Sequence, residues 1–168
     1  IHGETTTWQA LNYGTWRALE ELYAKGTVRA IGVSNFMPHH LVPLLARARI
    51  RPMVNSIEFH PGYMQLPALR FCRAQGIGVL GWAPLGRGAL LANPVLARIA
   101  QEHHRTVAQV CLRWSLEHGV PPIVKSVNAA HLEENARIFD FALSMAEMHA
   151  IDALPSAGFS GLDPDHVS

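Results

Sequence analysis

A short apolar run that follows a helix stop constrains the fold of this chain most strongly. Gly26 stands directly after a helical pattern, with Lys25 beside it, and glycine there allows the left-handed backbone of a helix C-cap. Val28–Val33 is β-branched and almost wholly apolar, which is typical of a parallel strand covered on both faces. Ser34 and Asn35 follow at its carboxyl end. They could cap the next helix or face a ligand, because parallel α/β folds bind ligands at this end of their strands.

Three further strands with similar endings are predicted at residues 53–59, 77–82 and 123–125. Helical spacing of apolar residues lies between them, over residues 66–75, 106–118, 129–138 and 144–154, with other helices ending near Ala24 and beginning at Pro38 and Pro94. Strand–helix alternation at intervals of roughly 25–40 residues indicates a parallel α/β architecture. Four such units make half of an eight-stranded (β/α)8 barrel of the TIM type. Residues 155–168 have no period and are predicted to form a C-terminal tail.

Composition excludes several other classes of protein. The 168 residues fit one domain, and 49% hydrophobic with 16% charged residues is a globular composition. A formal net charge of +1 argues against a nucleic-acid partner. No apolar run approaches the ~20 residues that a membrane-spanning helix needs, and no signal peptide is visible. Cys72 and Cys111 fall in helical apolar patterns, which favours reduced thiols in a cytoplasmic protein over a disulfide framework.

The histidines predict no metal centre. His39–His40 and His103–His104 are adjacent pairs, whose side chains should diverge on a helix, so we expect them on a solvated surface. His60 precedes Pro61 at a strand end, where it could shape a loop or the rim of a substrate site. Neither a zinc-ligand spacing nor a Gly-x-Ser-x-Gly elbow is present.

Polar or aromatic side chains recur at the carboxyl ends of all four predicted strands. They are Ser34–Asn35, Ser56 with Glu58, Trp82 followed by Gly86–Arg87–Gly88, and Lys125–Ser126. The amide and hydroxyl groups would suit a carboxamide, and Trp82 would stack on a flat ring. The glycine-rich backbone with Arg87, and Lys125 with the helix start after it, would suit phosphates. A Gly-x-Gly loop alone is a weak signal, but the combination predicts a nicotinamide dinucleotide with a 2′-phosphate.

These endings and the strands before them resemble the aldo-keto reductase family. The matching segments are Val28–Phe36, Val54–Pro61, Trp82–Gly86, and Val124–Ser126 followed by Glu134–Asn135. The resemblance runs from about residue 14 to residue 154, and Trp82 with the ending Gly161–His166 resembles the bacterial branch that includes 2,5-diketogluconate reductases. It implies a (β/α)8 barrel that reduces aldehydes and ketones with NADPH. Residues 1–168 would be the C-terminal, NADP-binding half of that barrel.

The resemblance also implies a role for each cofactor residue. Ser34, Asn35 and Ser56 would hold the nicotinamide carboxamide, and Trp82 would stack on the ring. The residues that would line the pyrophosphate are Leu85, Gly86, Arg87 and Gly88. Those that would surround the 2′-phosphate are Lys125, Ser126, Val127, Asn128 and His131, and Glu134 with Asn135 would meet the adenine.

Two of these positions depart from the family pattern. The family usually has Gln where this chain has Ser56, so one amide partner of the carboxamide is lost. It usually has Arg where this chain has His131, and a neutral imidazole lacks the permanent charge and fixed fork of a guanidinium. We therefore expect NADH to bind as well, with Lys125 still favouring NADPH.

The family's proton-donating Asp, Tyr and Lys find no match in this chain. Hydride transfer needs a general acid, and a Tyr serves near neutral pH only when a neighbouring Lys lowers its pKa. Tyr13, Tyr23 and Tyr63 do not match the family's Tyr motif. His2 corresponds to the family's catalytic His, which orients the substrate carbonyl, but it could equally be a structureless terminal residue.

Two functions of different class follow. In the first, the intact enzyme transfers a hydride from NADPH to a small aldehyde, ketone or keto sugar, and this chain alone is inactive. In the second, the chain is a non-catalytic nicotinamide-nucleotide-binding or regulatory module. A different phosphate-binding barrel enzyme would require the motifs to be coincidental. We expect the complete barrel to be monomeric, whereas half a barrel has unpaired strand edges that favour self-association.

Overall fold

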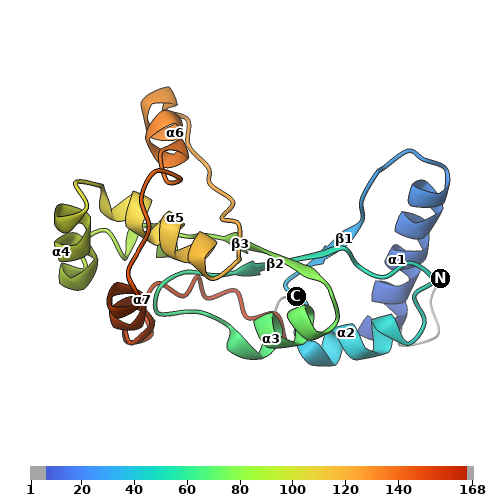
Figure 1. The fold of residues 1–168 in the computed structure, drawn as a ribbon. Coiled ribbons are helices and arrows are strands. Elements are labelled where there is room, and N and C mark those ends of the chain that lie inside the picture. Colours follow the sequence, from blue (N-terminus) through green and yellow to red (C-terminus); the bar gives the residue numbers. More distant parts are fainter. Residues whose placement is uncertain (1–6, 166–168) are drawn as a thin grey trace.

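A three-stranded parallel sheet lies at the centre of the structure, which is a computed structural model that describes residues 7–165. Helices α2 and α3 lie along one side of this sheet, α1 lies at one end of the molecule, and α4, α5 and α7 gather at the other (Figure 1). The elements are α1 (Trp8–Ala24), β1 (Gly32–Ser34), α2 (Pro38–Leu45), β2 (Val54–Glu58), α3 (Leu66–Ala74), β3 (Gly78–Trp82), the 3-10 helix η1 (Gly86–Gly88), α4 (Pro94–Glu102), α5 (Val107–Glu117), α6 (Ala129–Ala136) and α7 (Met145–Asp152).

The strands run in the order β1-β2-β3, and all neighbours are parallel. This confirms the predicted α/β architecture. β1 is shorter than predicted and comprises only residues 32–34. The ladder between β1 and β2 begins only at Gly32 and Val54, because Pro52, two residues before β2, has no N–H to donate to the neighbouring strand. The first bond to this strand segment therefore comes from the Met53 N–H, which donates to the Ile31 carbonyl at 2.9 Å.

The fourth predicted strand, at residues 123–125, is wrong as a strand. The chain does return beside β3 in the parallel direction, but only through a single bridge between Gly81 and Pro122. The Gly81 N–H donates to the Pro121 carbonyl at 2.9 Å, and the Ile123 N–H donates to the Gly81 carbonyl at 2.7 Å. Pro121 has no N–H to extend the ladder toward the start of β3, and Ala83, with φ +51°, ends the extended conformation of β3, so the ladder is limited to these two bonds.

Local capping explains where the helices begin and end. Gly26 has φ +71°, and the Gly26 and Thr27 N–H groups donate to the carbonyls of Tyr23 and Leu22, which confirms the predicted helix stop. Ser144 begins α7 in a capping box with Glu147, also as predicted.

The core consists of two clusters of buried apolar side chains. The larger one joins β2 and β3 to helices α2, α3, α4, α5 and α7, and the smaller one is formed by Trp16, Ile31 and Leu44. Phe59 and Trp114 stack in the larger cluster with ring centroids 4.9 Å apart, and both are fully buried. Cys72 and Cys111 are free and buried, and burial raises the pKa of Cys111 to about 12, so this thiol stays protonated at neutral pH.

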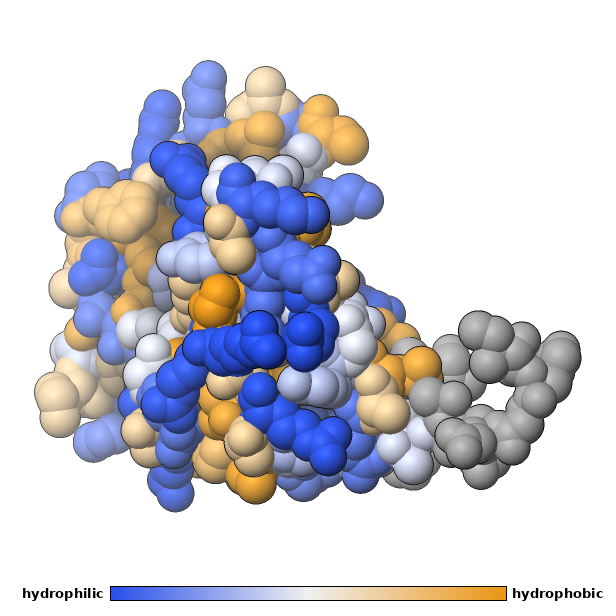
Figure 2. Space-filling model, turned by 90° about the vertical axis from the view of Figure 1, so that its right-hand side faces the viewer, coloured by the Kyte–Doolittle hydropathy of each residue, from blue (hydrophilic) through white to orange (hydrophobic). Residues whose placement is uncertain are grey.

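The face of the molecule at the α1 end is largely polar. Figure 2 looks at the end of the molecule that carries α1, where hydrophilic side chains predominate and apolar ones are scattered among them. Within residues 7–165, none of the helices combines the length and the apolar character needed to cross a membrane.

The stacked core pair leads to the first prediction. Phe59→Ala removes a ring that contacts Trp114 and leaves a cavity, so we expect the free energy of unfolding to fall by about 3–5 kcal/mol. The matched control is Phe139→Ala, because the Phe139 side chain is 75% exposed and its loss should change stability by less than about 0.5 kcal/mol. Urea unfolding of both variants measures the difference, and equal losses would contradict this view of the core.

Candidate functional site

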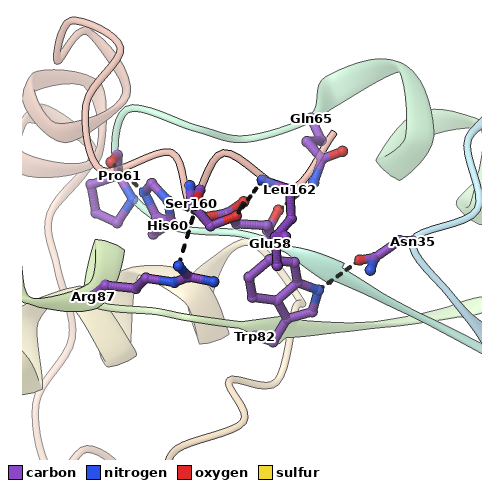
Figure 3. Close-up of polar contacts among 9 residues, drawn as sticks. All are labelled: Asn35, Glu58, His60, Pro61, Gln65, Trp82, Arg87, Ser160 and Leu162. Carbon is purple, nitrogen blue, oxygen red and sulfur yellow. Dashed lines mark hydrogen bonds and ion pairs between the residues drawn. The ribbon is translucent and has the colours of Figure 1, made fainter. Parts of the chain in front are cut away.

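The parallel register brings the endings of β1, β2 and β3 to one edge of the sheet. Ser34 pairs with Ser56, and Glu58 pairs with Trp82. Asn35, the residue after β1, has φ +59°, and its N–H donates to the Ser56 carbonyl at 2.8 Å. The Trp82 Nε1–H donates to the Asn35 Oδ1 at 2.8 Å (Figure 3). Residues that are 47 positions apart in the sequence thus present an amide and an indole side by side.

One cavity opens beside Asn35. It has a volume of about 520 Å³, and it is lined by Ser34 and Asn35 together with residues of α1, of α2 and of the C-terminal tail. The Ser34 hydroxyl donates to the Ser56 carbonyl at 3.2 Å. Ser34 and Asn35 both line this cavity, and their role at an amide-bearing group stays a prediction.

A second cavity opens on the other side of the β3 ending. It has a volume of about 260 Å³, and five of the predicted cofactor residues line it: Leu85, Arg87, Gly88, Lys125 and Asn135. Gly86 is buried behind this surface. Two cationic side chains, Arg87 and Lys125, line one cavity together with the glycine loop, and cationic groups suit a phosphate-bearing ligand.

The other residues predicted for the 2′-phosphate and the adenine lie around α6 and do not line this cavity. Asn128 caps α6 by accepting from the Ala130 N–H, and the Ser126 hydroxyl makes two bonds to the Asn128 backbone. Val127 is 99% exposed. His131 is exposed and Glu134 is half-buried on the helix. Their role at a 2′-phosphate or an adenine stays a prediction, and His2 lies outside the described residues.

A buried polar network next to the site was not predicted. Glu58 is 1% exposed and accepts from the N–H and the O–H of Ser160, with N···Oε1 2.9 Å and O···Oε2 2.7 Å. The His60 Nε2 lies 3.3 Å from Oε1, and the Gln65 side chain donates to the Glu58 carbonyl. Alternation along the strand places Ser56 and Glu58 on one face, but no local pattern indicates a partner 102 residues away.

Our expectation that His39 and His40 diverge is wrong. Their ring centroids are 4.0 Å apart, and the Nε2 atoms lie 2.7 Å and 3.1 Å from the Asp165 Oδ1. The Met37 N–H donates to the His40 Nδ1 at 3.1 Å. A neutral His40 therefore carries its proton on Nε2. The three side chains form a clasp between α2 and the C-terminal tail, in which His39 is hydrogen-bonded to Asp165 and the His40 Nε2 lies close to the same carboxylate oxygen.

The fold is a parallel α/β sheet with helices beside it, and the polar ends of its strands gather at one edge. Residues 8–155 match the family described as Aldo/keto reductase family, and the chain belongs to this family. A solved mutant of Gox0644 in complex with NADPH is similar over 93% of this chain and 58% of its own, with a TM-score of 0.89 and 39% identity. This similarity identifies the sheet and helices as part of the family's barrel.

Curated relatives include enzymes that are named as reductases. The glyoxal reductase of Bacillus subtilis is 52% identical over 153 residues, which cover 91% of this chain and 55% of the relative. The 9,11-endoperoxide prostaglandin H2 reductase of Trypanosoma cruzi is 46% identical over 155 residues, covering 90% and 55%. The chain thus spans about half the length of these relatives.

The clasp on α2 leads to a prediction on pH. Burial and the neighbouring His39 lower the pKa of His40 below its ordinary 6.5, against the opposing effect of Asp165. The unfolded chain therefore binds more protons just below that value, and the free energy of unfolding should fall as the pH drops through and below 6.5. His40→Asn keeps an acceptor for the Met37 N–H without titrating, so its stability should fall less.

Chemical unfolding at about pH 7.5 and about pH 5.5 measures this loss. His149→Asn, at an exposed histidine, serves as the control and should behave as the original chain does. If His40→Asn lost as much stability as the original chain over this range, His40 would not be the group that titrates.

Proposed function

We propose that this chain forms the NADPH-binding half of an aldo-keto reductase barrel. The observation that supports it most directly is the cavity that joins the glycine loop (residues 85–88) to Lys125 and Asn135, beside the Asn35–Trp82 pair. Asn35 with Ser34 would hold the carboxamide, and the glycine loop with Arg87 would hold the diphosphate. Lys125 would meet the 2′-phosphate.

The donor set fits this cofactor. Two cations and a loop that contains Gly86 and Gly88 match a polyanion, and a half-buried indole next to an amide matches a flat ring with a carboxamide. The nicotinamide, when bound, supplies the hydride. The related Gox0644 mutant that was solved with NADPH supports the same choice.

The substrate class that we propose is a small aldehyde, ketone or keto sugar. The names of the relatives, among them glyoxal reductase, support reduction of compact carbonyl compounds. Phe159 of the C-terminal tail, whose ring lies 4.8 Å from that of Tyr63, would form an apolar part of the substrate rim.

We propose that the proton donor comes from outside the described residues. Burial, together with the charges of Glu58 and Asp163, raises the pKa of Tyr63 above 10.0, which is the opposite of what a tyrosine acid needs near neutral pH. We therefore expect this chain alone to bind NADPH without oxidising it in the presence of glyoxal. The same observation favours the second candidate, a non-catalytic binding module. Gene sequence upstream of residue 1 separates the two, since an Asp, a Tyr and a Lys on strand ends there would indicate the reductase.

Lys125→Ala tests the assignment of the 2′-phosphate. Loss of a charge-assisted contact should weaken NADPH roughly 10–100-fold, while NADH, which has no 2′-phosphate, should change little. The dissociation constants are measured from quenching of tryptophan fluorescence, with Trp82→Phe identifying the reporter.

The chain offers a matched control because Lys25 and Lys125 are its only lysines. Lys25 caps α1 and lines neither cavity of the site, so Lys25→Ala should leave both affinities unchanged. If the chain without any substitution binds neither nucleotide, the proposed function is refuted. Equal weakening of NADPH and NADH by Lys125→Ala would refute only the role given to Lys125.

A further inference from the structure

The C-terminal tail packs directly against the glycine loop. A Cβ built on Gly158 would lie 3.0 Å from the Gly86 Cα and 3.2 Å from the His60 Cε1, so the two backbones meet where no side chain fits. Gly86 has φ +53° and Gly158 has φ +73°, conformations that glycine adopts without strain. The loop and the tail therefore fit together as two backbones in contact.

A second contact joins the tail to the loop through Arg87. Its Nη1 donates to the Ser160 carbonyl at 3.4 Å (Figure 3). Arg87 has φ +54°, a left-handed conformation that is strained for a non-glycine residue. The surroundings must stabilise this backbone. The tail does so by contacting Gly86 through Gly158 and Arg87 through Ser160.

The buried carboxylate of Glu58 anchors the tail at this point. Both of its oxygens accept from Ser160, one from the N–H and one from the O–H, and His60 contacts the first oxygen. Hydrogen bonds to an ionised group in a water-excluded place are strong, because a lost partner leaves a buried charge unpaired. Glu58 itself does not line the cavity with Lys125, so any effect on a ligand there passes through the tail and the loop.

We propose that Glu58 and Ser160 are positioning residues for cofactor binding. Glu58 holds Ser160, and the tail around Ser160 holds the glycine loop in the shape that binds a diphosphate. The inference rests on the proposed function, and it adds an element that the cofactor residues alone do not contain. Because NADPH and NADH share the diphosphate, loss of this anchor weakens both by the same factor, whereas loss of Lys125 weakens NADPH alone.

Hydrogen exchange of the chain without any nucleotide tests whether Ser160 holds the glycine loop in its conformation. The amides of Gly88, Ala89 and Leu91 donate within the loop region and report on its order. In Ser160→Ala their exchange should rise roughly tenfold, as expected for one lost hydrogen bond to a charged group, while amides in α1 keep their rates.

Two further variants serve as controls. Ser160→Thr restores the hydroxyl and should restore slow exchange. Ser156→Ala, at an exposed serine of the same tail, should change nothing. Unchanged exchange at these three amides in Ser160→Ala would overturn the inference.

Nucleotide titration tests the functional step. Ser160→Ala should raise the dissociation constants of NADPH and NADH by the same factor, roughly tenfold, and Ser160→Thr should return both. Weakening of NADPH alone would overturn the role at the diphosphate. If the original chain binds neither nucleotide, the proposed function fails. If the original chain binds NADPH and both Ser160→Ala and Ser160→Thr bind it as tightly as the original chain does, only the inference fails.

Discussion

The parallel register of β1, β2 and β3 is the constraint on which the site depends. Parallel strands all end at the same edge, so pairing Ser34 with Ser56 and Glu58 with Trp82 brings Asn35 beside the indole. A one-residue slip of β2 would turn Ser56 and Glu58 toward the opposite face. Buried Asn55 opposes such a slip, because its amide donates to the Phe36 carbonyl at 2.7 Å and accepts from the Phe36 N–H.

Much of the fold could be predicted because its determinants are local. Alternation of β-branched runs with helical stripes located β2, β3 and the helices to within a few residues, and Gly26 and Ser144 marked helix ends by their own chemistry. The fourth strand failed for an equally local reason. Pro121 cannot donate to β3 and Ala83, with φ +51°, ends β3, and the hydrophobicity of Ile123–Val124 alone reveals neither limit.

The contacts of the C-terminal tail could not be predicted, because they join distant segments. Glu58 and Ser160 are 102 residues apart, and His39 and Asp165 are 126 apart. Each pair depends on where the tail crosses the strand ends, which the spacing of residues does not encode. The tail looks irregular in the sequence, since it has no period. Two carboxylates nevertheless hold it in place: Glu58 of β2 binds Ser160 of the tail, and Asp165 of the tail binds His39.

The two ends of the candidate site differ in how firmly the fold holds them. Asn35 and Trp82 belong to the sheet edge, whereas α6 buries no side chain and stands apart from the body of the molecule (Figure 1). Its C-terminal end is held by buried Gln109 of α5, whose amide donates to the carbonyls of Glu134 and Arg137 at 2.9 Å and 3.0 Å. Elements with few buried contacts open at low free-energy cost. A dinucleotide bound as we propose would therefore meet a sheet edge that is held firmly at one end and an α6 segment that is held by few buried contacts at the other.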